Sequence, residues 1–181
     1  MAQKPPRSRV IPAMTRVFED HGYEGASLSA IGSASGLSKA GLYHHFPAGK
    51  SEMAGQVLAA SGKRFTQLIL APLRSKDPAA ERFAAMLDGL ITYYEQGTIN
   101  CLMNTLSLGE GRALFGPNIR TAMEAWLAAL KPTLSELGAD DPERQSRLII
   151  AQVQGILIQC RLFDEPDLFM DMMRGLKRRY R

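Results

Sequence analysis

Apolar residues recur along the chain at intervals of three and four, the spacing that places side chains on one face of an α-helix. Val10, Met14, Val17 and Phe18 show it in the first such segment, which Gly22 ends. Further helices are expected near residues 27–34, 38–46, 50–71, 77–97, 100–108, 116–130, 141–162 and 166–176. No segment alternates apolar and polar residues as a strand does. The pattern predicts an all-α fold of about nine helices.

Prolines set several expected helix boundaries, because proline lacks the N–H that a helix interior uses. Pro12 either lies in the first turn of the first helix or shortens that helix at its start. Pro72 interrupts the fourth helix, and Pro117 opens a helix after Gly116. Pro132 is expected to kink or restart the helix in which it lies.

The segment SLSAIGSASGLSKAGLYHHF, residues 27–46, has the features of two short helices joined by a tight turn. Ser27 and Ser38 can each accept a backbone N–H as a helix cap. Gly36 supplies the left-handed conformation that a sharp turn between the helices requires. The segment therefore predicts a helix-turn-helix, whose second helix begins near Ser38.

The second helix of this motif carries side chains suited to the major groove of DNA. Lys39 can donate to a guanine edge or a phosphate, and Ala40 can contact a thymine methyl. Tyr43 and His44 can donate to phosphate oxygens, and the small residues Ala40 and Gly41 allow a close approach to the base pairs. The expected DNA-binding residues are Ser27, Ser38, Lys39, Ala40, Gly41, Tyr43, His44 and Lys50. We expect Leu42 to face inward, together with His45 or Phe46. An unrelated helical hairpin is the alternative.

This stretch, with GKSEM after it, resembles the DNA-binding domain of TetR/AcrR-type transcriptional regulators. The resemblance covers about a quarter of the chain and includes both caps, the glycine turn and the aromatic ending YHHF. Gly32 and Ser35 stand where that family usually has alanine. The glycine is expected to lower helix propensity by about 1 kcal/mol.

The resemblance implies a division of the chain. Residues 1–50 would form a three-helix DNA-binding domain and residues 51–181 an effector-binding and dimerisation domain, connected by a helix over 50–71. It also implies that Lys50 contacts the DNA backbone, a role that suits a lysine at a helix N-terminus. Two recognition helices of a homodimer would then lie about 34 Å apart on a palindromic operator.

The net charge of +4 lies entirely in the part of the chain that contains the motif. Through Arg64 there are eight Lys and Arg against four Asp and Glu, and from Phe65 onward there are fourteen of each. A basic segment favours a polyanion, although such patches often only solvate a surface. The basic residues Lys4, Arg7 and Arg9 belong to a polar start of the chain, which is either a DNA-contacting arm or a frayed tail.

The helix over 141–162 is apolar on more than one face, which favours burial on two sides. One face would pack on the protomer's own core, and the other, with the last helix, on a symmetry mate. Gly155 would permit the close approach, and packing within a monomer is the alternative. The expected interface residues are Val153, Ile156, Leu157, Phe169 and Met173.

Large apolar and neutral polar residues recur on the helices between Asp77 and Asp164, which resemble the family's effector-binding domain. The expected effector contacts are Met86, Leu90, Tyr93, Tyr94, Cys101, Met103, Trp126 and Gln152. The runs NCLMNTLSL and GILIQCRLFD are most similar to the LmrA/YxaF type of the family, which implies a neutral or aromatic effector. Cys101 is either a sensor of oxidants or electrophiles or a buried structural cysteine.

These features favour a ligand-responsive DNA-binding regulator, most simply a repressor, over an enzyme. The three histidines His21, His44 and His45 all lie in the DNA-binding segment, and no catalytic set or metal-ligand spacing follows. We therefore expect no cofactor and no metal. No run is long and apolar enough to span a bilayer, so a cytoplasmic location is expected. An all-helical enzyme or small-molecule carrier that uses the C-terminal cavity is the alternative.

Overall fold

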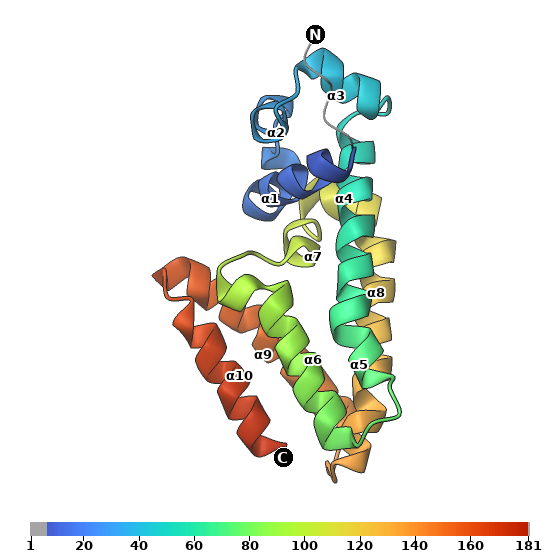
Figure 1. The fold of residues 1–181 in the computed structure, drawn as a ribbon, viewed down its shortest axis with the longest axis vertical. Coiled ribbons are helices and arrows are strands. Elements are labelled where there is room, and N and C mark those ends of the chain that lie inside the picture. Colours follow the sequence, from blue (N-terminus) through green and yellow to red (C-terminus); the bar gives the residue numbers. More distant parts are fainter. Residues whose placement is uncertain (1–6, 181) are drawn as a thin grey trace. The chain divides into compact units, whose positions relative to one another are not determined.

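The computed structural model of the protein describes residues 7–180. Every regular element among these residues is helical, so the prediction of an all-α fold is confirmed (Figure 1). The helix α4, the π-helical turn η1 and the short helix α5 follow one another without a gap. The first six residues, which include Lys4 of the expected arm, lie outside the described part.

The chain forms two compact units. The first comprises the described residues up to Gly62 together with Leu102–Ile119, and the second comprises Lys63–Cys101 and the described residues from Arg120. Two helices, α4 (Lys50–Phe65) and α8 (Gly109–Glu136), begin in the first unit and end in the second. The expected division at residue 50 therefore differs from the structure, which groups residues 102–119 with the N-terminal segment.

The first unit contains α1 (Arg7–Gly25), α2 (Leu28–Ser35), α3 (Lys39–His45), the start of α4, α7 (Leu102–Thr105) and the start of α8. Helix α1 packs against both α2 and α7. The fully buried side chains of this unit come from its helices in turn and include Val10, Met14, Phe18, Ile31, Leu42, Phe46 and Met53. The Thr105 hydroxyl donates to the carbonyl oxygen of Phe18 at 3.2 Å, which fixes α7 on α1.

Helix α1 contains both residues that were expected to bound it. Pro12 lies inside the helix and not at its start. Gly22 interrupts the helix, as predicted, with φ 65° and ψ −169°, before the chain continues to Gly25. A side chain at Gly22 would also approach the carbonyl oxygen of Thr105 at 3.3 Å. Glycine is therefore required there for its backbone conformation and for its small size.

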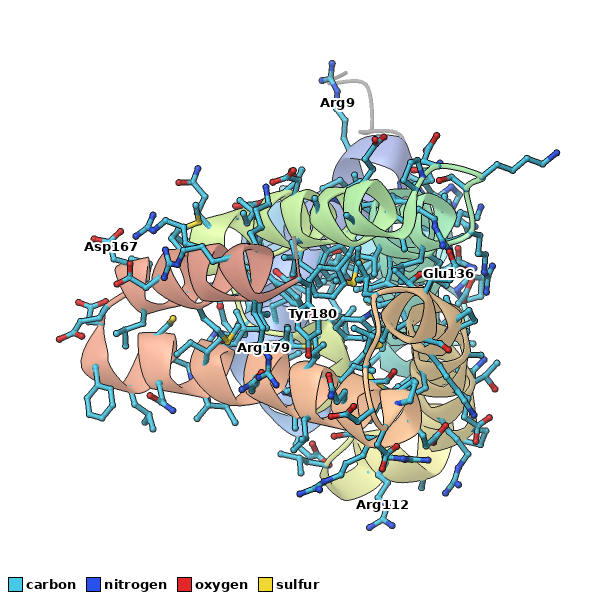
Figure 2. The ribbon with its side chains drawn as sticks, turned by 90° about the horizontal axis from the view of Figure 1, so that it is seen from below. Arg9, Arg112, Glu136, Asp167, Arg179 and Tyr180 are labelled. Atoms are coloured by element: carbon cyan, nitrogen blue, oxygen red, sulfur yellow. The ribbon has the colours of Figure 1, made fainter. Side chains whose placement is uncertain are left out.

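The second unit contains the end of α4, η1 (Thr66–Leu70), α5 (Ala71–Leu73), α6 (Ala79–Tyr93), the 3-10 turn Glu95–Gly97, the rest of α8, α9 (Pro142–Phe163) and α10 (Asp167–Arg179). Helix α10 packs on both α9 and α6. Tyr180 closes this group, because its ring packs on Phe83 at 4.8 Å between centroids and its hydroxyl donates to Gln145 at 2.6 Å (Figure 2). Tyr180 thereby joins the end of α10 to α6 and α9.

Helix α8 runs unbroken for 28 residues through Pro117 and Pro132, so the predictions of a helix start and of a restart at these prolines were wrong. Contacts of the residues that follow Pro132 hold the helix in place. Arg82, buried in α6, donates to the hydroxyl of Thr133 at 3.2 Å and forms an ion pair with Glu136. Such contacts compensate for the backbone hydrogen bond that a proline removes.

No helix in residues 7–180 combines the length and the apolar character that a bilayer crossing requires.

Candidate nucleic-acid interface

The two caps expected of the helix-turn-helix are present. The Ser27 hydroxyl accepts the backbone N–H of Ala30 at 3.0 Å, and the Ser38 hydroxyl accepts that of Gly41 at 3.1 Å. Gly36 ends α2 in the left-handed conformation, with φ 70°, and donates to the carbonyl oxygen of Gly32. The turn is thus built by the local signals that the sequence displays.

Gly32 lies directly against the turn of the motif. A Cβ atom there would lie 2.7 Å from the carbonyl oxygen of Leu37 and 3.8 Å from the Leu42 side chain. Leu37 donates its own N–H back to Gly32 at 3.0 Å, so the turn folds directly over this glycine. The departure from alanine that the sequence shows at this position therefore has a steric reason.

Helix α3 presents one side to the surface. Lys39, Ala40 and His44 are exposed, and Tyr43 keeps 43% of its surface accessible. Gly41 is buried, because its α-carbon faces Leu37 and Ser38. It therefore does not belong to the exposed face, contrary to its expected place among the DNA contacts.

Lys50 begins α4 and is half-buried beside the end of α1. Its ammonium lies 4.5 Å from the centre of the Tyr23 ring and donates to the carbonyl oxygen of Glu24 at 3.4 Å. Glu52, in the same first turn, accepts the N–H of Ala48 at 2.9 Å. The start of α4 thus carries a lysine whose position is fixed by α1.

Arg7 has a role that the sequence did not reveal. Its guanidinium donates to the carbonyl oxygen of His45, lies 5.1 Å from the centre of the Phe46 ring and pairs with Glu52 at 3.7 Å. It therefore ties the start of α1 to the end of α3 and to α4. The sequence showed only a basic residue near two others, and only the fold reveals these partners. Arg9 remains exposed (Figure 2).

Comparison with known proteins decides the identity of this motif. Residues 11–57 match the family model described as bacterial regulatory proteins, tetR family. Residues 11–57 therefore form a DNA-binding domain of the TetR type. The chain is 24% identical over 155 residues to the uncharacterized regulator YxaF of Bacillus subtilis, covering 82% of this chain and 81% of that protein.

Two further proteins similar to this chain are informative. The HTH-type transcriptional regulator LmrA of Bacillus subtilis is 33% identical over 84 residues, which is 46% of this chain and 45% of LmrA. The chain thus spans less than half the length of LmrA. The regulator CifR, solved with a 26-base-pair operator DNA, has the same fold, with a TM-score of 0.78, 19% identity and complete coverage of both chains.

Most residues expected to bind an effector are buried. Met86, Leu90, Tyr93, Tyr94, Cys101 and Trp126 lie in the second unit with at most 6% of their surface accessible. Met103 is buried too, but it belongs to α7 of the first unit. Gln152 is exposed on α9 and does not join the buried group, so its expected role is not supported by its placement.

The buried group is built around a row of aromatic rings in edge-to-face contact. Trp126 packs on Phe65 at 5.2 Å, Phe65 on Tyr93 at 5.5 Å, and Tyr93 on Tyr94 at 4.9 Å. Tyr94 packs in turn on Phe169 at 5.9 Å. This ring row crosses the second unit from α8 through α4 and α6 to α10.

Polar atoms lie beside the ring row at Tyr94 and at Trp126. The Tyr94 hydroxyl donates to the thiol of Cys101 at 3.4 Å and accepts from the side-chain amide of Gln154 at 3.4 Å. Burial, followed by the neighbouring Cys101, raises the pKa of Tyr94 well above its ordinary value. Among the described residues, no partner is found for the buried indole N–H of Trp126 or the amide oxygen of Gln154.

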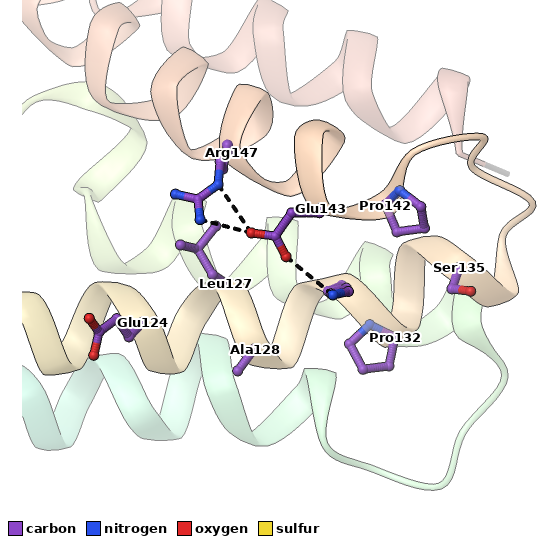
Figure 3. Close-up of a pocket in the computed structure, with 9 residues that line it drawn as sticks. Glu124, Leu127, Ala128, Pro132, Ser135, Pro142, Glu143 and Arg147 are labelled. Carbon is purple, nitrogen blue, oxygen red and sulfur yellow. Dashed lines mark hydrogen bonds and ion pairs between the residues drawn. The ribbon is translucent and has the colours of Figure 1, made fainter.

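A surface pocket of about 590 Å³ lies between α8 and α9 (Figure 3), and none of the ring row's residues lines it. Glu143 lies at its centre and pairs with Lys131 at 3.3 Å and with Arg147 at 2.8 Å. Hydrogen bonds to the carboxylate lower the pKa of Glu143, and the bond from Lys131 has a larger effect than the bond from Arg147. None of the residues expected to bind an effector lines this pocket.

The expected dimer interface requires correction. Val153, Leu157, Phe169 and Met173 are buried inside the second unit, with at most 4% accessible surface, and only Ile156 is partly exposed. The apolar side chains that α9 exposes are different ones. Phe163 is exposed at the end of the helix. The others follow intervals of three and four residues and comprise Leu148, Ala151, Ile158 and Leu162, with Gly155 at the centre. We call this set the α9 stripe.

Within residues 7–180, no group of three or more His, Cys, Asp or Glu side chains is arranged to hold a metal ion.

Proposed function

We propose that this chain is a TetR-family regulator that binds duplex DNA through α3, acts as a homodimer on a palindromic operator, and represses transcription until a small molecule releases it. The exposed face of α3 carries the first part of the proposal. Lys39, Ala40, Tyr43 and His44 stand on a helix whose start is capped and whose inner side is buried. This is the placement that base-edge and phosphate contacts require.

Lys50 supports the same proposal from the start of α4. A helix N-terminus and a lysine together favour an anion, and a phosphate is the anion that duplex DNA supplies. The lysine contributes affinity without sequence information, whereas Lys39 on α3 is suited to contribute specificity. The relative CifR is bound to operator DNA in its structure, which agrees with this use of the fold.

The α9 stripe supports homodimerisation. Its residues repeat at intervals of three and four along 15 positions, the pattern by which two helices pack their side chains between one another. The accessible fractions are 50% for Leu148, 44% for Ile158 and 68% for Leu162. A row of exposed apolar side chains on one helix face is typical of an interaction surface, whereas a single exposed one is not. Nothing lies within 4 Å of the Cβ position of Gly155, so a second helix has room to approach there. A two-fold axis near Gly155 would make the stripe complementary to itself.

The ring row supports a small-molecule effector in the second unit. Burying a polar atom without a partner costs about 1–3 kcal/mol. One such atom belongs to Trp126 of the ring row and another to Gln154, which contacts Tyr94. A neutral or aromatic molecule with both an acceptor and a donor group would satisfy them. Trp126 is the single tryptophan of the chain, so its fluorescence reports on this site directly.

The proposed release follows from the continuity of α4 between the units. Lys50 begins this helix in the first unit, and Phe65 of the ring row ends it in the second. An effector that moves Phe65 would displace α4, the helix that begins with Lys50. The loss of DNA affinity would then depend on how much more tightly the effector binds the displaced conformation than the DNA-binding one. Because chromosomal DNA is the proposed partner, we place this activity in the cytoplasm.

The test is the change Lys39→Ala, with Lys76→Ala as the control. Lys76 is exposed in the second unit, so both variants lose one positive charge. Fluorescence anisotropy would compare a duplex selected by the protein with a random duplex. We expect Lys39→Ala to lower the preference for the selected duplex by about 5- to 150-fold, the value of a bidentate base contact. Equal weakening on both duplexes would reduce Lys39 to a phosphate contact, and no binding of either would refute the function.

A further inference from the structure

Glu24, at the end of α1, lies against the N-terminus of α8. Its carboxylate accepts the backbone N–H of Glu110, the second residue of α8. Hydrogen bonds from the backbone, that of Glu110 first, lower the pKa of Glu24. The first N–H groups of a helix lack partners within the helix, and a carboxylate is a favourable acceptor for them. Glu24 therefore acts as the N-terminal cap of α8, contributed from a different helix.

Glycines make room for this contact. Gly109, the first residue of α8, has φ 50°, and a Cβ atom on it would overlap the Glu24 carboxylate. A Cβ atom on Gly111 would lie 2.8 Å from the carbonyl oxygen of Leu106 and 3.2 Å from the Tyr23 side chain. The start of α8 is thus shaped to accept the end of α1 at close range.

The same two residues of α1 hold Lys50. The carbonyl oxygen of Glu24 accepts the Lys50 ammonium at 3.4 Å, and the Tyr23 ring lies beneath that ammonium. The Tyr23 ring also packs edge-to-face on Phe115 of α8 at 5.8 Å. Tyr23 and Glu24 therefore contact the beginning of α4 on one side and the beginning of α8 on the other.

We propose that Glu24 is a positioning residue for DNA binding, which fixes Lys50 by anchoring the end of α1 to the start of α8. This inference rests on the proposed contact of Lys50 with the DNA backbone. Because α8 continues into the second unit and carries Trp126 there, it forms a path from the ring row to Lys50 that is separate from α4. A displacement of α8 would reach Lys50 through Glu24.

The sign of the effect separates this proposal from simple electrostatics. A carboxylate near DNA repels phosphates, so its removal alone would strengthen binding. If Glu24 positions Lys50, truncation of the side chain must weaken binding in spite of the lost repulsion. Glutamine keeps an oxygen that can accept the Glu110 N–H while it removes the charge. Glu24→Ala and Glu24→Gln are therefore expected to change the affinity in different ways.

The experiment measures binding of a random-sequence duplex of about three helical turns by the full chain, using fluorescence anisotropy. We expect Glu24→Ala to bind about fivefold more weakly, the equivalent of one lost helix cap. Glu24→Gln is expected to bind as tightly as the parent or more tightly. In a Lys50→Ala background, Glu24→Ala should cause no further loss, because the positioned group is absent.

Gly109→Ala provides a second variant, which displaces the Glu24 carboxylate but keeps its charge. It should weaken binding as Glu24→Ala does, and the double variant should be no weaker than either. Circular dichroism shows whether Glu24→Ala or Gly109→Ala fails to fold. If one of them does, the DNA affinity of the other tests the inference. The inference about Glu24 would be wrong if Glu24→Ala bound DNA as tightly as the parent or more tightly. It would also be wrong if Glu24→Ala lowered the affinity equally in the parent and in the Lys50→Ala background. Either result would leave the proposed phosphate contact of Lys50 standing. Unchanged binding by Lys50→Ala would overturn both the inference and the proposed phosphate contact.

Discussion

The change Gly32→Ala tests whether the turn of the helix-turn-helix depends on a missing side chain. Helix propensity alone predicts that alanine stabilises α2 by about 1 kcal/mol. The structure predicts the opposite, because the new Cβ atom would lie 2.7 Å from the carbonyl oxygen of Leu37. That oxygen belongs to the main chain of the turn, so the clash cannot be relieved by a side-chain rotation.

The magnitude follows from the two opposing effects. Overpacking in a tight site typically destabilises by about 1–3 kcal/mol, and the propensity gain offsets about 1 kcal/mol of this. We expect Gly32→Ala to lower the free energy of unfolding by about 1 kcal/mol. Because relief requires the turn to move, α3 should also shift relative to α2, and DNA affinity should fall.

Gly62→Ala is the matched control. Gly62 also lies inside a helix, α4, but nothing lies within 4 Å of its Cβ position. This variant should gain about 1 kcal/mol and bind DNA as the parent does. Thermal unfolding followed by circular dichroism should then separate the two variants by about 4–8 °C for a chain of this length. If both variants stabilise equally and Gly32→Ala keeps full DNA affinity, the steric argument is wrong.

Three further changes test other parts of the account. Lys50→Ala should weaken binding to selected and random duplexes alike and reduce the slope of log affinity against log salt by about 1; an unchanged slope would exclude a phosphate contact. Ile158→Glu should dissociate the dimer in sedimentation analysis, whereas Leu114→Glu, an equally exposed apolar position on α8, should not; a dimeric Ile158→Glu would exclude the α9 stripe. The pKa of Tyr94 is raised in the folded chain, so above about pH 10 this side chain ionises only in the unfolded chain, which lowers stability. Tyr94→Phe should therefore reduce the loss of unfolding free energy above that pH. An unchanged dependence of the unfolding free energy on pH would contradict the burial of Tyr94.

Local signals predicted the DNA-binding motif correctly because each of them acts within a few residues. Ser27, Ser38 and Gly36 form caps and a turn that depend on little beyond their immediate neighbours. Prolines were less informative, because Pro132 lies in a helix that Arg82 and its partners hold together from a distant part of the chain. The fold class and the helix boundaries set by local caps were therefore predictable, but the boundaries of α8, which depend on distant contacts, were not.

The two-sided helix α9 shows why the binding surfaces were harder to predict. Its apolar residues cover two faces, and periodicity alone does not say which face turns toward the protomer core. Val153 and Leu157 were assigned to the interface but lie inside, whereas Ile158 and Leu162 are exposed. The regular three-and-four spacing of the exposed set was present in the sequence and is the signal that identifies the α9 stripe.

The same helix explains the error at the effector site. Gln152 and Gln154 differ by two positions, which places them on nearly opposite sides of a helix. Gln154 reaches the Tyr94 hydroxyl, whereas Gln152 is exposed. The sequence contained two equivalent glutamines, and only the packing of α9 distinguishes them.

The central claim is that a dimer presents two copies of α3 to adjacent major grooves. Selection of bound sequences from a pool of random duplexes by the purified full chain tests this claim most directly. The account predicts an enriched inverted repeat whose half-site centres lie about 10 base pairs apart, or a multiple of that spacing. Enrichment of a single unrepeated site, or of no sequence at all, would contradict it.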